Sequence, residues 1–210
     1  KGIAKGLYKT EIRGAENIPE NGGFIICANH VSKIDFLFIS LALSKERYMK
    51  LCCMAKKELF RNDPFSRKLI KSAGMVTVDR GGMNSSSMEN IKKRLKENWG
   101  VIIHPEGTRS EDGVFRKIKN GASTLAIETG APIIPAYVDG AYNIFPKSGK
   151  MPKFYDWKHH KKFRLSVTFG KPISPDGLTT EELTAEIERA ISVLQDENST
   201  LPQFQSHSAE

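Results

Sequence analysis

Short apolar runs alternate with segments of helical periodicity along most of this chain. Six runs have the length and composition of buried strands, at residues 23–29, 49–55, 74–80, 100–105, 131–138 and 164–170. Helices are expected after Ser32, around 64–72, from about 86 to 98 and near 121–129. Strands and helices that alternate in this way predict an α/β sheet with helices on its faces.

The last helix is the most clearly marked. Apolar residues recur there at three- and four-residue steps, at Leu183, Ile187, Ile191 and Leu194. The spacing of Thr179 and Glu182 matches a capping box that would begin this helix. Because the sequence then becomes polar, we expect one domain over residues 1–195 and a frayed tail over residues 196–210.

Composition and charge narrow the classes of partner. The 210 residues suit one domain, and a formal charge of +8 indicates an anionic partner. Nucleic acid, a phosphorylated metabolite and an acidic membrane surface all qualify. No apolar run approaches the roughly 18 residues that cross a bilayer, and we see no signal peptide. The sequence starts at Lys1 rather than at a methionine, which leaves room for an upstream apolar anchor.

The three cysteines are expected to be structural. Cys52 and Cys53 are adjacent, and Cys27 has no partner at the spacing of a zinc or redox motif. We therefore expect all three to pack as small apolar residues in a reducing compartment.

His30 and Asp35 form the first candidate for chemistry. In one continuous helix they would lie about 140° apart and could not meet. If the helix starts at Ser32, His30 lies in the preceding loop and can fold back to Asp35. Ser32 and Asp35 also have the spacing of a capping box, so an ordinary helix start explains the same residues.

Two further segments place polar residues at the ends of strands. Residues 104–110 (HPEGTRS) lead from a buried strand into a turn, where Arg109 offers a planar fork suited to phosphate oxygens. Residues 74–80 (GMVTVDR) end similarly, with Asp79 and Arg80. Loops at strand ends often form sites in α/β proteins, although each segment alone also fits a plain turn.

Taken together, these segments resemble the 1-acylglycerol-3-phosphate acyltransferase family of glycerolipid acyltransferases. The resemblance rests on residues 29–35 (NHVSKID), 74–80, 104–110, 118–126 (IKNGASTLA) and 130–138 (GAPIIPAYV), and it covers about residues 8 to 175. It implies a single α/β domain with a mixed β-sheet flanked by helices. One departure is His104, where the family usually has an aromatic residue, and we interpret it as a packed substitute rather than as a second base.

The resemblance also implies roles for individual residues. His30 and Asp35 match the family's catalytic pair. The residues expected to bind the phosphate and glycerol of the substrate are Arg80, Glu106, Gly107, Thr108 and Arg109. The implied reaction moves a fatty acyl group from acyl-CoA or acyl-carrier protein to the free hydroxyl of a 1-acylglycerol 3-phosphate, which gives phosphatidic acid. No metal and no bound cofactor are expected.

The chemistry of acyl transfer suits these residue types. A neutral imidazole can take the hydroxyl proton, Asp35 would orient it, and the substrate hydroxyl then replaces an enzyme nucleophile. The turn after Asn29 is our guess for the amides that stabilise the oxyanion. Glycerol 3-phosphate, another lysophospholipid or a lyso amino-acid lipid is an alternative acceptor. A hydrolase that activates water and a non-catalytic module that binds nucleic acid or anionic membranes are alternatives from other classes.

Two basic segments are candidates for contact with a membrane. Residues 56–74 carry six basic and two acidic residues among leucine, phenylalanine and isoleucine. Residues 157–164 (WKHHKKFR) add four basic residues without an acid, and their adjacent histidines are more typical of a solvated loop than of a metal site. We therefore expect a peripheral protein at the cytoplasmic face of a membrane, although a solvated basic surface explains both segments equally well.

Overall fold

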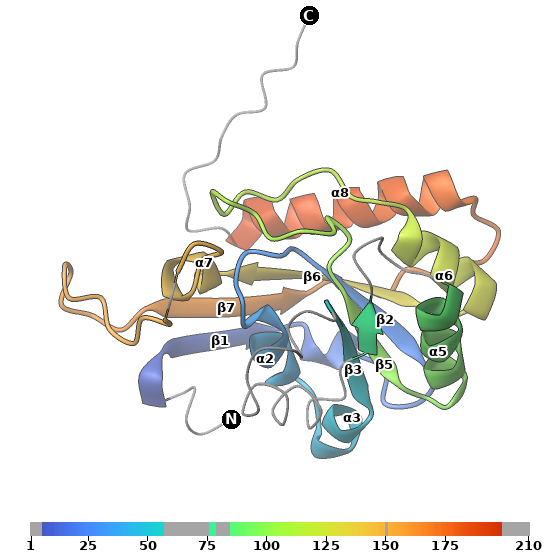
Figure 1. The fold of residues 1–210 in the computed structure, drawn as a ribbon, viewed down its shortest axis with the longest axis horizontal. Coiled ribbons are helices and arrows are strands. Elements are labelled where there is room, and N and C mark those ends of the chain that lie inside the picture. The colour runs from blue at the N-terminus through green and yellow to red at the C-terminus, as the bar shows by residue number, and fades with distance from the viewer. Residues whose placement is uncertain (1–5, 57–75, 79–84, 150, 199–210) are drawn as a thin grey trace, which may run out of the picture.

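The fold is a mixed seven-stranded sheet covered by helices on both faces, as a computed structural model shows for residues 6–56, 76–78, 85–149 and 151–198 (Figure 1). The strand order is β1-β7-β6-β2-β5-β3-β4. The strands are β1 (Lys9–Arg13), β2 (Phe24–Ala28), β3 (Leu51–Lys56), β4 (Val76–Val78), β5 (Gly100–Ile103), β6 (Ile133–Asp139) and β7 (Arg164–Phe169). Neighbouring strands are parallel except for β6 and β7. The expected α/β fold with a mixed sheet is confirmed.

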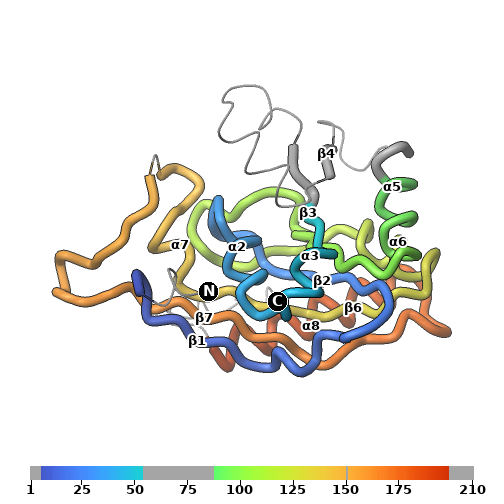
Figure 2. Tube along the Cα trace, turned by 90° about the horizontal axis from the view of Figure 1, so that it is seen from below, coloured from blue at the N-terminus to red at the C-terminus, as the bar shows by residue number. Residues whose placement is uncertain are grey.

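The helices belong to two layers, one on each face of the sheet (Figure 2). Their bounds are α2 (Asp35–Ser40), α3 (Lys45–Met49), α5 (Ser85–Lys96), α6 (Gly121–Thr129), α7 (Ala141–Ile144) and α8 (Thr180–Asn198), with a 3₁₀ turn η1 (Ala15–Asn17). Helices α5, α6 and α8 pack on one face, and α2 and α7 pack on the other.

The central strand β2 explains why the sheet is covered twice. All five of its residues are buried, and successive side chains point to opposite faces. Phe24 and Ile26 join the core beneath α2, whereas Ile25 and Cys27 join the core beneath α5, α6 and α8. A continuous apolar strand of this kind needs a layer of helices on each side. Cys27, Cys52 and Cys53 are all buried, as predicted, and none of the three forms a disulfide.

The segment boundaries differ from the predictions in a few places. The capping box before α8 is confirmed, because Thr179 and Glu182 exchange hydrogen bonds. Helix α8 continues to Asn198, so the polar segment from residue 196 begins inside this helix. Strand β1 and the short helices α3 and α7 were not predicted, because their sequences are polar or too short to show a period. The helix expected at 64–72 and most of basic segment 56–74 lie outside the described residues.

The topology places the ends of several strands at one edge. Strands β2, β5 and β6 are parallel and adjacent, so the loops after them leave from the same edge of the sheet. His30 follows β2, residues 104–110 follow β5, and α7 follows β6. None of the helices in the described residues combines the length and the apolar composition needed to cross a bilayer.

Candidate active site

The loop after β2 is held in place by Asn29. The side-chain amide of this buried residue donates to the carbonyl of Val138 at 3.0 Å, and its oxygen accepts from the Val138 amide at 2.7 Å. Asn29 therefore extends the pairing of β2 with β6 by one residue and fixes where the chain turns. His30 is the first residue after this anchor.

His30 and Asp35 are in contact, as the sequence predicted. The Nδ1 atom of His30 lies 2.9 Å from Oδ2 of Asp35. The same oxygen accepts hydrogen bonds from the backbone amides of Val31 and Ser32, each at 2.9 Å. Because Oδ2 is an acceptor, Nδ1 carries the imidazole proton and Nε2 is the basic nitrogen.

The helix start differs from the prediction. Helix α2 begins at Asp35 rather than at Ser32, and no side chain caps it. The Ser32 hydroxyl instead donates to the carbonyl of Phe145, in the segment after α7. Only one half of the expected capping box is present, in which Asp35 accepts from the Ser32 amide. The other half is lost because the turn from His30 to Ile34 is irregular and wraps around the carboxylate.

Burial controls the charge of Asp35. The residue is 1% exposed, and its loss of water raises the pKa to about 6, although His104, the two backbone amides and Arg109 oppose that rise. The carboxylate is therefore ionised at neutral pH. Its second oxygen, Oδ1, is buried without a hydrogen-bond partner among the described residues. The imidazole of His30 is 24% exposed and so lies at the surface of the site.

The turn after β5 clamps the backbone of His30. Oε1 of Glu106 accepts from the His30 amide at 2.8 Å, and the Ser110 amide donates to the His30 carbonyl at 2.7 Å. Oε2 of Glu106 accepts from the Arg116 amide at 3.2 Å. Glu106 is 7% exposed, and burial raises its pKa to about 7. Its side chain therefore ties two loops together, while its predicted contact with substrate stays a prediction.

Gly107, Thr108 and Arg109 form the outer part of this turn. Gly107 has a φ of 75°, a conformation that side chains disfavour, so glycine is required for the turn. Thr108 is exposed and Arg109 is half-buried. Arg109 is close enough to Asp35 for the two charges to attract each other. Arg109 therefore supplies positive charge near the His30–Asp35 pair, while the predicted contacts of Gly107, Thr108 and Arg109 with substrate stay predictions.

Comparison with known proteins identifies the family of this chain. The model of the Acyltransferase family matches residues 9–139. The chain is 31% identical over 163 residues to the 1-acyl-sn-glycerol-3-phosphate acyltransferase of Bacillus subtilis, which covers 78% of this chain and 73% of that protein. The chain belongs to the Acyltransferase family.

A second relative and a solved structure extend the comparison. The 1-acyl-sn-glycerol-3-phosphate acyltransferase of Borreliella burgdorferi is 30% identical over 67% of this chain, which spans only 55% of that protein. The crystal structure of the 1-acyl-sn-glycerophosphate (LPA) acyltransferase PlsC from Thermotoga maritima superposes with a TM-score of 0.73 at 24% identity, covering 93% of this chain and 75% of that one. That likeness confirms the fold.

The amides after Asn29 contradict our guess about the oxyanion. In this acyltransferase the His30 amide donates to Glu106, and the amides of Val31 and Ser32 donate to Asp35. All three amides donate to carboxylates of the protein and so are not available to a substrate oxygen. The guess was wrong because the turn uses its donors to hold the two carboxylates.

Sequence reasoning missed one cation at the site. A side chain placed on Gly107 would approach Nζ of Lys119 to 3.1 Å, so this ammonium group lies over the turn that carries Arg109. The Lys119 amide also donates to the carbonyl of Pro105. The available signal was a lysine two residues before the glycine that begins α6. Arg80, which was expected to join this cluster, lies outside the described residues.

His104 stacks on the imidazole of His30. The two rings are 4.0 Å apart between centroids and only 9° from parallel. Nδ1 of His104 lies 3.0 Å from the carbonyls of both Ala28 and Asn29, so it carries the proton. Burial, together with the charge of His30, lowers the pKa of His104 to about 4. This neutral, half-buried ring fits the interpretation of a packed substitute for an aromatic residue.

We expect His104→Phe to retain most of the acyltransferase activity, because a phenyl ring keeps the stacking surface against His30. His104→Ala should lower the rate by about tenfold through loss of orientation, and it should lower the free energy of unfolding by about 2 kcal/mol or more through the cavity it leaves. Steady-state rates and denaturant unfolding measure both effects. If both variants instead lost about 10² or more in rate, as removal of a base would cause, His104 would act as a second base.

The possible metal-ligand atoms of His30, Asp35 and His104 lie within 4.8 Å of one another, which is close enough to hold a metal ion. The direct contact of Asp35 with His30, and that of His104 with two carbonyls, make the cluster a hydrogen-bonded unit as it stands. The expectation that no metal takes part stays a prediction.

The cysteine thiols have pKa values raised to about 11 or 12, chiefly by burial, so none is a ready nucleophile.

Proposed function

We propose that this acyltransferase moves a fatty acyl group from an acyl thioester to the free hydroxyl of a 1-acylglycerol 3-phosphate, which yields phosphatidic acid. The observation that carries the proposal is the 2.9 Å contact between His30 Nδ1 and the buried carboxylate of Asp35. This contact leaves a basic nitrogen on an imidazole at the surface of the site. The names of the Bacillus and Borreliella relatives favour the same acceptor.

The reaction follows from the protonation states. Nε2 of His30 takes the proton of the acceptor hydroxyl as its oxygen attacks the thioester carbonyl. The carboxylate of Asp35 stabilises the imidazolium that forms. As the tetrahedral intermediate collapses, the new ester forms, the carbon–sulfur bond breaks and the imidazolium returns the proton to the leaving thiolate. The acceptor hydroxyl is the nucleophile, so no acyl-enzyme is required.

Acid–base catalysis supplies only part of the rate. A positioned base contributes roughly 10² to 10⁴, and the rest requires orientation of the acceptor and stabilisation of the oxyanion. Arg109 would bind the acceptor phosphate, with Lys119 beside it. The backbone amides of Thr108 and Arg109 donate to no group within the described part of the chain, which leaves them available to an anion.

The acyl donor and the setting are further parts of the proposal. Acyl-CoA and acyl-carrier protein are both suitable donors, because each carries a thioester on a long flexible arm. The acceptor and the product are membrane lipids, so the enzyme would work as a peripheral protein at the cytoplasmic face of an anionic membrane. Glycerol 3-phosphate or another lysophospholipid would use the same base and remains the alternative acceptor.

The test is a labelled acyl-CoA assay with phosphorylated and unphosphorylated acceptors, run with wild type and Arg109→Ala. We expect wild type to form phosphatidic acid from lysophosphatidic acid. Arg109→Ala should raise the KM for this acceptor by at least about tenfold, because a charge-assisted contact is lost, and should change little for an acceptor without phosphate.

Arg116→Ala is the matched control. This neighbouring guanidinium is 59% exposed and pairs with Asp112 at the surface, so its loss should leave the KM unchanged. An unaltered KM in Arg109→Ala would contradict the phosphate contact. Release of free fatty acid by wild type without any acceptor would instead indicate a thioesterase.

A further inference from the structure

The segment between α7 and β7 contains a projecting hairpin, residues 151–163, which we call the basic hairpin (Figure 1). Asp156 and Lys161 exchange backbone hydrogen bonds of 2.9 and 3.2 Å and close its turn. The Asp156 carboxylate accepts from Nδ1 of His159 at 2.8 Å. Tyr8 anchors the hairpin by donating to the Lys153 carbonyl at 3.1 Å. The hairpin therefore has a defined conformation.

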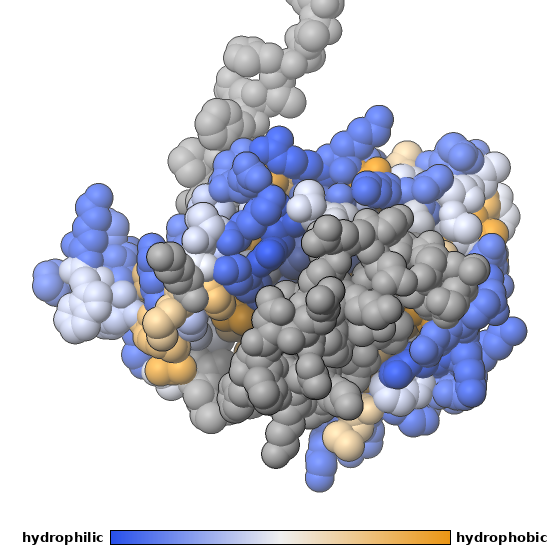
Figure 3. Space-filling model, viewed as in Figure 1, coloured by the Kyte–Doolittle hydropathy of each residue, from blue (hydrophilic) through white to orange (hydrophobic). Residues whose placement is uncertain are grey.

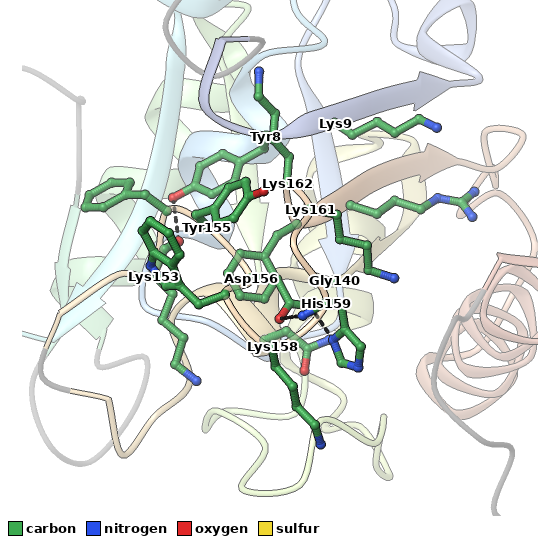
Figure 4. Close-up of a pocket in the computed structure, with 15 residues that line it drawn as sticks. Tyr8, Lys9, Gly140, Lys153, Tyr155, Asp156, Lys158, His159, Lys161 and Lys162 are labelled. Atoms are coloured by element: carbon green, nitrogen blue, oxygen red, sulfur yellow. Dashed lines mark hydrogen bonds and ion pairs between the residues drawn. The ribbon is translucent and has the colours of Figure 1, made fainter.

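Cationic side chains surround a hollow at the base of the hairpin (Figure 4). The hollow has a volume of about 1340 Å³, and its cations are Lys9, Lys153, Lys158, Lys161, Lys162 and Arg164. Asp156 is the one acidic residue in 151–163, and its carboxylate contacts the imidazole of His159. No carboxylate in the described residues lies within ion-pair distance of Lys153, Lys158 or Lys161. This surface therefore has positive charge that the described residues do not neutralise.

The same hairpin exposes large apolar side chains. Trp157 is 78% exposed and Met151 is 74% exposed, the two highest values for large apolar residues in the described part of the chain. Phe154 is 49% exposed. The Tyr155 ring packs edge-on against Trp157 at 4.9 Å, which supports the indole in its outward position. Among the coloured residues in Figure 3 hydrophilic ones predominate, and an apolar area lies beside the projecting hairpin.

The basic hairpin leaves the same edge of the sheet as the active site. Strand β6 ends at Asp139 and is parallel to β2, which ends just before His30, so both loops start on one side. The segment that leads into the hairpin also packs on the active-site loop. The Lys33 amide donates to the Phe145 carbonyl, and the Lys33 ammonium donates to the Gly149 carbonyl.

We propose that the basic hairpin docks the enzyme on the surface of an anionic lipid bilayer, with Trp157 and Met151 in the headgroup region and the lysines on lipid phosphates. Tryptophan with a wet polar edge is favoured at bilayer interfaces, and lysines extend their charge to the headgroups while their stems lie on apolar surface. Each lysine near an anionic surface strengthens binding. Docking would bring the active site to its lipid acceptors. This benefit for catalysis rests on the proposed function.

The combination of features favours a bilayer over other anionic partners. Nucleic acid or an acidic carrier protein would explain the lysines equally well. Neither explains why Trp157 and Met151, the two most exposed large apolar side chains of the described residues, belong to the same hairpin, where they cost solvation free energy unless something apolar covers them. Lipid headgroups overlying an apolar interior match both features.

The test compares vesicle binding by wild type, a hairpin variant and a matched control. The hairpin variant combines Trp157→Ala, Lys158→Glu and Lys161→Glu. The control combines Met49→Ala, Lys45→Glu and Lys50→Glu, which makes the same charge change and removes an exposed apolar side chain at α3, before the start of β3 and hence at the other edge of the sheet. Vesicles of phosphatidylcholine, with or without phosphatidylglycerol, are sedimented with each protein.

We expect wild type and control to bind the vesicles that contain phosphatidylglycerol, with weaker binding at high salt. The hairpin variant should bind at least about 30-fold more weakly. It lacks two lysines, and loss of each lysine at such a surface weakens binding about fivefold. Equal binding by all three proteins, or equal loss in variant and control, would overturn the proposal. Normal vesicle binding by the variant with loss of activity only when acyl-carrier protein is the donor would assign the hairpin to that protein instead.

A fluorescence measurement provides an independent readout. The chain has two tryptophans, so Trp99→Phe leaves Trp157 as the single tryptophan. We expect its emission to shift to shorter wavelength on anionic vesicles and to be quenched by brominated lipids, and unchanged emission would overturn the proposal. Activity on a short-chain, water-soluble lysophosphatidic acid separates the docking proposal from the proposed function, because this acceptor does not require a membrane. Wild type that binds vesicles but acylates no acceptor would defeat the proposed function and leave the docking surface standing.

Discussion

His30→Ala is expected to lower kcat by at least about 10², because it removes the base that takes the hydroxyl proton during attack. The KM for the acceptor should change little, since Arg109 and the turn that carries it remain. Initial rates with labelled acyl-CoA and lysophosphatidic acid measure both constants. Turnover equal to that of wild type would remove His30 from the mechanism.

The chain offers a close control for this experiment. His159 also contacts an aspartate through Nδ1, at 2.8 Å from Oδ2 of Asp156, but this pair lies exposed in the basic hairpin. His159→Ala should leave kcat unchanged when the acceptor is a short-chain, water-soluble lysophosphatidic acid. The comparison tests whether position in the site, rather than a His–Asp contact as such, makes the imidazole catalytic.

Asp35→Asn is expected to lower kcat by about 5- to 30-fold while the fold is kept, because a neutral acceptor stabilises an imidazolium by roughly 1–2 kcal/mol less than a charged one. The asparagine oxygen can still accept from His30 and from the amides of Val31 and Ser32. Its NH₂ group would then occupy the position of Oδ1, which is buried without a partner among the described residues. The substitution therefore removes charge and keeps geometry.

The pH dependence of this variant adds a second readout. Activity requires neutral His30 and is lost as pH falls and the imidazole becomes protonated. Without the carboxylate the imidazolium is less stable, so the acidic limb of the pH–rate profile should move to lower pH in Asp35→Asn. The pKa of Asp35, about 6 in wild type, adds a titration in that range which the variant lacks. An unchanged maximal rate and an unchanged profile would reduce Asp35 to a structural role.

The sequence was informative wherever the physical signal is local. Strand β2 is a continuous apolar run, and α8 shows both its period and its capping pair in adjacent residues. Burial of a strand or of a helix face depends on side chains a few positions apart, so these elements could be predicted. Strand β1 could not, because an edge strand with polar residues gains its order from pairing with β7, which is more than 150 residues away.

At the site, the sequence by itself predicted which residues carry chemistry, and it required that His30 and Asp35 meet across a bend, as they do. The tertiary structure alone decided how that bend is held. Its amides are taken up by the carboxylates of Glu106 and Asp35, Asn29 is fixed by Val138, and His104 stacks on His30. These contacts join strands β2, β5 and β6, whose order in the sheet is set by long-range pairing. A linear pattern does not encode which strand ends become neighbours, so the surroundings of the His30–Asp35 pair emerge only when the sheet is assembled.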